Sequence, residues 1–229
     1  MNPPSPTTAA APPPPTSLRE RKKAKTRAAL IEVSQRLFRE RGYSETTLEE
    51  ICAEVEIRPQ TLLRYFESKA HLAIAPTVDR LEPLRVSLRD PERRDDALTI
   101  FRRYITDEAQ MFASDGADSA SDIVHQRRTW EAPETRDPIV GALVTAAYRG
   151  VSDDLATAIA ADHGVADDDL HSMLVATLVL AGCSAVYERW GRRAHDADAL
   201  VDDLQAVIDY AVESLPRRTA RRLHRIAAR

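Results

Sequence analysis

The sequence predicts an all-α protein. Only seven of its 229 residues are glycine, and apolar residues recur every three or four positions along most of the chain, as on the buried face of a helix. No segment alternates between apolar and polar residues for long enough to form a strand. Hydrophobic residues make up 43% of the chain, which is enough to build a core.

Composition divides the chain into four segments. Residues 1–17 hold seven of the fourteen prolines and are expected to form a disordered, proline-rich leader. Residues 18–70 are expected to form a small helical domain, and residues 71–215 a larger one. Residues 216–229 are a basic tail with six arginines and no acidic residue.

Three helices are expected in the small domain. The first ends at Gly42, because a glycine commonly follows the last helical residue. The second opens at Thr47 with the capping-box pattern Thr-Leu-Glu-Glu and is about two turns long. Pro59 begins the third helix, where its missing N–H leaves nothing unpaired. A short break between the second and third helices is typical of a helix-turn-helix unit.

Longer helices are expected in the larger domain. Pro76 and Pro83 interrupt or delimit the helices around residues 69–90, because proline breaks the helical hydrogen-bond pattern. Pro91 is expected to open the next helix, which runs to about Ala113. Further helices are then expected at residues 122–131, 138–162, 167–193 and 198–215.

The net charge of −4 hides a division of charge along the chain. Residues 17–75 carry twelve Lys or Arg and nine acidic residues, whereas residues 76–213 carry fourteen and twenty-seven. Two basic ends around an acidic body suggest contact with a polyanion. Solvated faces explain most charged runs equally well, so charge alone decides nothing.

Two stretches of the small domain carry a more specific signal. They are RLFRERGYSETTLEEI, from Arg36 to Ile51, and TLLRYFESK, from Thr61 to Lys69, and they resemble the signature of the TetR family of bacterial transcription regulators. The resemblance covers residues 20–72. It implies an all-α homodimer with an N-terminal three-helix helix-turn-helix DNA-binding domain and a C-terminal helical ligand-binding and dimerisation domain. A cytoplasmic location is expected separately, because no membrane helix or signal-peptide pattern is found. The implied function is a ligand-responsive repressor that a small molecule releases from double-stranded operator DNA.

The resemblance also implies roles for single residues. Contacts to DNA phosphates are expected from Thr47, Thr61, Tyr65 and Lys69. Gln60 and Arg64 are expected to read bases, because each can pair with a purine edge through two hydrogen bonds. Arg58 is expected to read either a base or a phosphate. A basic arm before and into the first helix adds phosphate or minor-groove contacts, or is only a solubilising tail; its lysines are Lys22, Lys23 and Lys25.

Two residues depart from the family pattern. An aromatic residue is common at the position of Leu63, so this leucine either meets a thymine methyl group or belongs to the core. Glu56 occupies a turn position where small residues, often glycine, are usual, and a positive φ there costs a residue with a side chain roughly 1 kcal/mol. Glu56 also puts a negative charge near the DNA, which predicts a modest affinity.

The last two helices are expected to form the dimer interface, through Leu178, Ala185, Leu204, Ile208 and Ala211. The alternative is that these apolar stripes only close the core of one monomer. Lining residues for an effector pocket are expected among the aromatic and methionine side chains Phe101, Tyr104, Met111, Trp130, Tyr148 and Met173. The effector is expected to be apolar, or acyl-CoA-like because residues 188–204 weakly resemble a subgroup of the family with such ligands.

Other classes of protein find less support. The sequence contains no nucleophile–base pattern, glycine-rich phosphate loop or metal-ligand spacing, so no catalytic residue, metal or cofactor is expected. Cys52 and Cys183 are expected to be buried thiols rather than a disulfide. No run of about 20 apolar residues predicts a membrane helix. A protein-binding relative that has lost DNA binding remains an alternative, because of Glu56. The arginines of the basic tail are expected to contact DNA phosphates, the acidic body of the protein or only solvent.

Overall fold

The computed structural model describes residues 17–114, 137–190 and 197–214. Within these ranges it contains eight helices and no strand, which confirms the predicted all-α class. The chain divides into two compact units, an N-terminal unit (Met1–Glu67) and a C-terminal unit (Ser68–Arg229). The leader up to residue 16, the helix expected at residues 122–131 and the basic tail lie outside the described residues.

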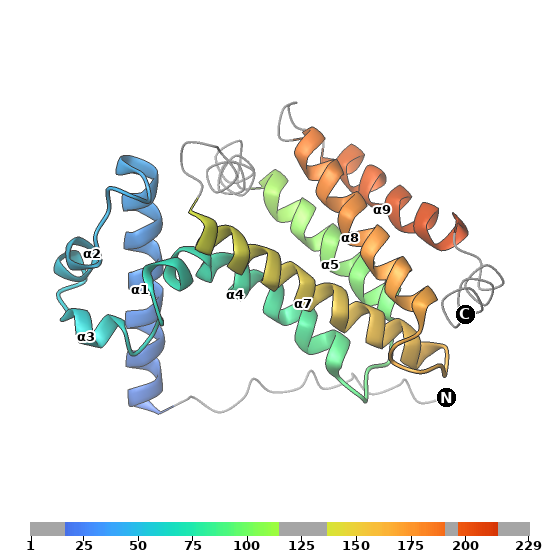
Figure 1. The fold of residues 1–229 in the computed structure, drawn as a ribbon, viewed down its shortest axis with the longest axis horizontal. Coiled ribbons are helices and arrows are strands. Elements are labelled where there is room, and N and C mark those ends of the chain that lie inside the picture. Colours follow the sequence, from blue (N-terminus) through green and yellow to red (C-terminus); the bar gives the residue numbers. More distant parts are fainter. Residues whose placement is uncertain (1–16, 115–136, 191–196, 215–229) are drawn as a thin grey trace, which may run out of the picture. The chain divides into compact units, whose positions relative to one another are not determined.

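The N-terminal unit consists of α1 (Leu18–Arg41), α2 (Leu48–Glu54) and α3 (Pro59–Leu62) (Figure 1). Capping boxes begin the first two helices, one between Ser17 and Glu20 and one between Thr47 and Glu50. Each box satisfies backbone groups that the first helical turn leaves unpaired. The helix starts at Thr47 and Pro59 and the stop at Gly42 therefore lie where the sequence predicts them.

A small core holds the N-terminal unit together. Leu30 and Leu37 of α1, Ile51 of α2 and Leu62 of α3 are fully buried. The buried Thr46 hydroxyl donates to the backbone oxygens of Leu37 at 3.3 Å and Gly42 at 2.9 Å. This bond fixes the path of the chain between α1 and α2, because a buried hydroxyl without a partner would destabilise the fold.

The C-terminal unit contains α4 (Lys69–Arg89), α5 (Ala97–Ser114), α7 (Pro138–Asp162), α8 (Leu170–Trp190) and α9 (Ala197–Ser214). Following the contacts, α4 packs on α7, α7 on α8, α8 on α9, and α9 on α5, which returns to α4 and α7 (Figure 1). The five helices thus surround one apolar core. Their amphipathic stripes have no other way to leave water within one unit.

Pro76 and Pro83 do not interrupt α4, and this part of the prediction is wrong. Both lie inside one continuous helix from Lys69 to Arg89. Each removes a helical hydrogen bond at a cost of about 3 kcal/mol. Buried leucines after Pro76, among them Leu81 and Leu88, offset that cost by packing into the core. Packing over the length of the helix therefore outweighs the local preference of proline.

The start of α5 also differs from the expectation. Pro91 does not open the helix, which begins at Ala97. Asp96 provides the cap, since its carboxylate accepts hydrogen bonds from the backbone N–H and the hydroxyl of Thr99, at 2.9 and 2.7 Å. The carboxylate of Asp162, at the end of α7, accepts from the N–H of Ala97 at 2.7 Å. An acidic cap is worth about 1 kcal/mol, and it determines the start here.

Leu204, Ile208 and Ala211 of α9 belong to the core of one chain, and their assignment to a dimer interface is wrong. The first two are fully buried, and Ala211 is almost so. They belong to the core where α9 packs on α5 and α8, whereas other residues of α9 are exposed, among them Asp202, Tyr210 and Val212. The alternative that the α9 stripe closes the monomer core is therefore the correct one.

Candidate functional site

The turn between α2 and α3 is closed by a pair of backbone hydrogen bonds. The N–H of Ile57 donates to Cys52 at 3.0 Å and the N–H of Glu56 to Ala53 at 3.3 Å, the arrangement that ends many helices at a left-handed residue. That residue is Glu56, with φ of 56°, so the positive φ expected from the sequence is present. A glutamate therefore adopts a conformation that favours glycine.

After this turn, a row of side chains from α3 and the following turn faces solvent. Helix α3 is only four residues long, and backbone bonds from Tyr65 and Phe66 to Leu62, at 2.8 and 3.0 Å, continue the turn. Gln60 and Arg64 are exposed, as base-reading residues must be. Leu63 lies between them and is 51% exposed, which excludes the alternative that it is a core residue.

The residues expected to contact phosphates differ in how exposed they are and in the hydrogen bonds that they already make. Thr47 is exposed, but its hydroxyl accepts from the N–H of Glu50 at 3.2 Å and donates to the Glu50 carboxylate at 2.8 Å. Thr61 and Tyr65 are half-buried. Lys69 is also half-buried and is the first residue of α4, so it belongs to the C-terminal unit.

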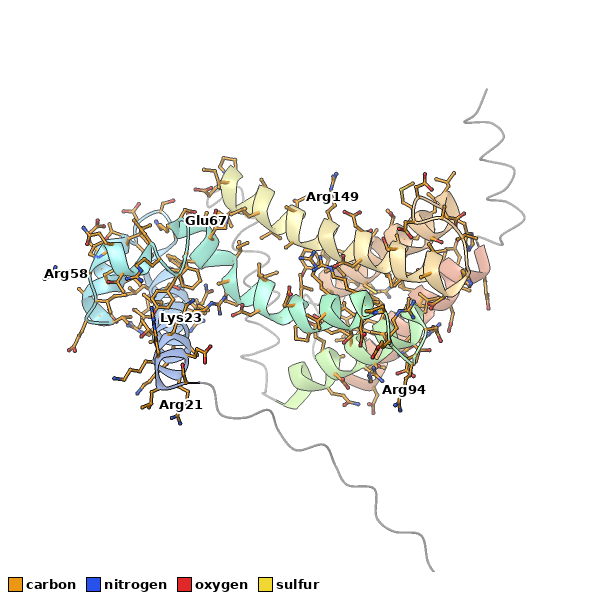
Figure 2. All side chains as sticks on the ribbon, turned by 90° about the horizontal axis from the view of Figure 1, so that it is seen from below. Arg21, Lys23, Arg58, Glu67, Arg94 and Arg149 are labelled. Atoms are coloured by element: carbon orange, nitrogen blue, oxygen red, sulfur yellow. The ribbon has the colours of Figure 1, made fainter. Side chains whose placement is uncertain are left out.

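The basic segment around Lys23 is helical. Lys22, Lys23 and Lys25 are exposed on the first turns of α1, which begins at Leu18. Figure 2 shows Arg21 and Lys23 on these turns and Arg58 at the start of α3. Because α1 begins at Leu18, these residues form part of a helix rather than a flexible tail.

The C-terminal unit contains a cavity of about 60 Å³ between α4, α5, α7 and α8. A buried water needs roughly 10–15 Å³ by this measure, so the cavity has room for several waters or a small organic group. Most of its wall is apolar. The apolar residues are Leu81, Leu84, Phe101, Ile105, Val151, Leu180 and Cys183.

One ion pair, three tyrosines and Ser184 form the polar part of the wall. Arg80 Nη1 donates to Glu108 Oε1 at 2.8 Å, and the side chains are only 18% and 7% exposed. The hydroxyl of Tyr104 also donates to Glu108 Oε1 at 2.8 Å, and that of Tyr187 to Oε2 at 3.4 Å. Arg80 Nη2 donates to the oxygen of Tyr148 at 3.1 Å. Four helices thus meet at this cluster.

The environment of the cluster changes the acidity of its members. Burial and the charge of Glu108 raise the pKa of Tyr104 and Tyr187 above the usual range. The same two causes raise the pKa of the Cys183 thiol to about 12. For Arg80, burial lowers the pKa, but Glu108 and the tyrosines more than offset it, so its pKa is raised. Tyr104 and Tyr187 therefore stay protonated donors and Arg80 stays charged near neutral pH.

The structure brings together some of the residues expected at a pocket. Phe101, Tyr104 and Tyr148 line the cavity. Met173 does not, because it is 49% exposed on the outer side of α8, and its assignment to the pocket is wrong for this cavity. Trp130 and the side chain of Met111 lie outside the described residues.

Sequence reasoning missed Arg80 and Glu108. Glu108 follows Phe101, Tyr104 and Ile105 at intervals that place all four residues on one side of α5. An acidic residue in an apolar stripe is rare unless it has a partner. That signal was present in the sequence, whereas the identity of the partner, 28 residues away on α4, required the fold.

The outer face of α8 is apolar and exposed. Leu178 and Ala185, both expected at the dimer interface, are exposed there together with Ala181. This helix has the length and apolar composition of a membrane span, with 28% of its most apolar stretch buried. Such a helix is weak evidence for a membrane, because the core helix of a soluble protein has the same composition.

The next features are possible metal ligands and the two cysteines. In the part of the chain that the structure describes, there is no group of three or more His, Cys, Asp or Glu residues that could hold a metal ion. Cys52 and Cys183 are both buried and free, as predicted.

Comparisons with known proteins match both units. Residues 30–75 match the model for bacterial regulatory proteins of the tetR family, and residues 112–216 match the model of the MftR C-terminal domain. The transcriptional regulator TcmR of Streptomyces glaucescens is 29% identical over 204 residues, 86% of either chain.

Solved structures share the fold at lower identity. Thermus thermophilus FadR, a TetR-family repressor in complex with lauroyl-CoA, is 18% identical with a TM-score of 0.54, covering 83% of this chain and 95% of its own. The SmeT–triclosan complex is 16% identical with a TM-score of 0.60, covering 83% and 91%.

The two family models lie in tandem and together match more than half of the chain. Regulators of this family are soluble cytoplasmic proteins that bind operator DNA, dimerise and bind small-molecule effectors, and the similar proteins are transcription regulators rather than enzymes. The helix-turn-helix geometry and the cavity agree with that family. The chain belongs to the TetR family of ligand-responsive, DNA-binding transcription regulators.

Proposed function

We propose that this regulator represses transcription from its operator and leaves the DNA when a small molecule occupies the cavity between α4, α5, α7 and α8. The observation that carries the proposal is the continuity of α4. Its first residue is Lys69, an expected phosphate contact, and its middle supplies Arg80, Leu81 and Leu84 to the cavity wall.

Helix α4 can couple the two ends mechanically. Eleven residues separate Lys69 from Arg80, which corresponds to about 16 Å along a helix. An effector that moves Arg80 or Leu84 outward therefore also moves the start of the helix. It favours release only if it binds the DNA-free arrangement more tightly than the DNA-bound one.

The DNA-reading surface in this proposal is the exposed row Gln60, Leu63 and Arg64, with Arg58 beside it. The glutamine and arginine read purine edges, and the leucine contacts a thymine methyl group. Lys22, Lys23 and Lys25 on α1 add contacts to phosphates, which give affinity without base preference.

A second copy of the chain is proposed to cover the outer face of α8. Leu178, Ala181 and Ala185 lie there in contact with solvent, although α8 is the most apolar of the long helices. Pairing two such faces removes apolar area from water. The dimer then presents two helix-turn-helix units to two half-sites of DNA, in the cytoplasm.

Matched variants test the position of the effector site. Cys183 and Val175 are both buried on α8, but only Cys183 lines the cavity. We expect Cys183→Phe to fill the cavity and keep the protein on operator DNA when compounds that release the wild type are added. Val175→Phe overpacks the same core and should keep the response. The measurement is fluorescence anisotropy of labelled operator DNA over a small-molecule library.

Two results would contradict the proposal. One is a Cys183→Phe protein that responds like the wild type to every active compound. The other is equal loss of the response in both variants, which would attribute the effect to overpacking rather than to the cavity. Circular dichroism should accompany each titration, since overpacking costs about 1–3 kcal/mol at either site.

A further inference from the structure

We infer that the effector is an uncharged molecule with a phenol or alcohol hydroxyl, and that this hydroxyl donates a hydrogen bond to Oε2 of Glu108. The inference rests on the proposed function, since it assigns a ligand class to the same cavity. Three features of the cavity wall support it: its charge balance, the unequal use of the two Glu108 oxygens, and the apolar surface around them.

The charges in the cavity wall cancel. Among the lining residues in the described part of the chain, Arg80 is the only cation and Glu108 the only anion, and they pair at 2.8 Å. An anionic ligand next to Arg80 would place two negative charges beside one positive charge, in surroundings where such charges are poorly screened. A cationic ligand beside Glu108 would create the opposite imbalance. The wall therefore favours a ligand without charge.

The two carboxylate oxygens of Glu108 are used unequally. Oε1 accepts two bonds of 2.8 Å, from Arg80 and Tyr104. Within the described part of the chain, Oε2 accepts one bond of 3.4 Å, from Tyr187, which is at the outer limit for a hydrogen bond. Since a carboxylate can accept about four bonds, Oε2 has capacity for a strong donor, and Glu108 is buried at the cavity wall.

The remaining wall suits a ring that carries this donor. Leu84, Phe101 and Ile105 offer apolar contacts, and the tyrosine hydroxyls surround the polar end. The neighbouring Tyr104 shows how a phenol behaves at this position, because burial and Glu108 raise its pKa and keep it protonated. A ligand phenol beside Glu108 meets the same conditions and donates its proton in a hydrogen bond without losing it.

Three probes, each with one ring and one ethyl group, test in the full-length protein whether the cavity prefers a neutral donor, a neutral molecule without a donor or an anion. They are para-ethylphenol, a neutral donor; para-ethylanisole, which has the oxygen but no donor; and para-ethylbenzoate, an anion. We expect calorimetry to show that the phenol binds about tenfold more tightly than either of the others, the usual effect of a hydrogen bond to a charged group. Equal or tighter binding of the benzoate or the anisole would overturn the inference. Tighter binding of lauroyl-CoA than of the phenol would do the same.

Glu108→Gln tests the hydrogen bond through the order of affinities for the probes, which would not reverse if Glu108 only stabilised the fold. The substitution leaves Arg80 without its counter-charge, so the order should reverse: affinity for the phenol falls about tenfold and affinity for the benzoate rises. Asp154→Asn is the matched control. Asp154 also joins α4 to α7, accepting from Arg85 at 2.7 Å and Arg89 at 2.9 Å, but it does not line the cavity. It should keep the preference of the wild type.

The comparison of probes on the wild-type protein stands even if Glu108→Gln does not fold. A wild type that binds no probe also overturns the inference. The proposed function fails separately, if compounds that release the operator act equally well on Cys183→Phe. Release by charged compounds alone, abolished in Cys183→Phe, would keep the proposed function and reject the inferred ligand class.

Discussion

Two buried polar groups, one in each unit of this regulator, find their hydrogen-bond partners in different ways. In the N-terminal unit the buried Thr46 hydroxyl is bonded to the backbone of Leu37 and Gly42, at most nine residues away. In the C-terminal unit the buried Glu108 is bonded to side chains of three other positions, two of them on α4 and α8. The bonds of Thr46 stay within one short segment, whereas those of Glu108 join three helices, so the packing of these helices and the proposed effector site depend on the same groups.

The difference also appears at the surfaces that carry function. Gln60 and Arg64, which are proposed to read DNA, lie exposed outside the core of their unit, so we expect them to contribute little to its stability. The residues proposed to sense the effector are part of the core itself. Mutations should therefore separate binding from stability in the N-terminal unit and couple the two in the C-terminal unit.

The largest expected effect comes from one substitution made at two leucines. Leu204→Glu puts a carboxylate at a fully buried position and should unfold the C-terminal unit, at a cost above about 5 kcal/mol. Leu178→Glu puts the same charge on the exposed face of α8 and should give a folded monomer. Circular dichroism and sedimentation velocity distinguish these outcomes. A folded Leu204→Glu monomer would show that Leu204 lies in the dimer interface and not in the core of one chain.

Arg80→Met tests whether the ion pair couples stability to the cavity. Removing one partner of a buried pair leaves the other charge without compensation, at a cost of about 3–5 kcal/mol. The double variant Arg80→Met/Glu108→Leu should recover most of this loss, because two apolar side chains replace the pair. Urea unfolding measures both. If Arg80→Met is as stable as the wild type, water reaches Glu108, and the ion pair does not couple the stability of the unit to the cavity.

These contrasts explain how far the sequence could predict the molecule. Ser, Thr, Pro and Gly at the ends of α1, α2 and α3 act within a few residues, so their effect is visible in the sequence. Pro76 and Pro83 gave the wrong expectation for α4, because packing against α7 outweighs their local preference. The stripe of α9 was assigned to the wrong interface, since a helical period identifies a buried face without identifying what buries it. Arg80 could not be paired with Glu108 for the same reason.

In the N-terminal unit, Arg64→Ala should change DNA binding without changing stability. The loss of base contacts is expected to weaken operator binding by roughly 1–3 kcal/mol and to relax base preference. Lys69→Ala removes an expected phosphate contact and should weaken binding to all sequences alike, with a smaller salt dependence. Gel shifts with operator and unrelated DNA at several salt concentrations measure this. Unchanged operator affinity in both variants would contradict the assignment of these residues.

The smallest expected effects lie at Glu56, where strain and charge can be separated. Glu56→Gly relieves the positive φ of 56° and should stabilise the N-terminal unit by about 1 kcal/mol. Glu56→Gln keeps the backbone strain and removes the negative charge, so it should leave the melting temperature unchanged. Both variants should bind DNA a few-fold more tightly at low salt, because a charge near the phosphates is gone. Raising the salt concentration should reduce this gain.

Two measurements on the pair decide what Glu56 does. If calorimetry finds Glu56→Gly no more stable than Glu56→Gln, the two backbone bonds of the turn, from Glu56 and Ile57, hold the left-handed residue at no net cost. If neither variant gains DNA affinity, the side chain lies away from the phosphates when DNA is bound. If only Glu56→Gly gains DNA affinity, the turn between α2 and α3 must change its backbone conformation when DNA binds. The N-terminal unit would then also adapt to its ligand, as we propose for the C-terminal unit.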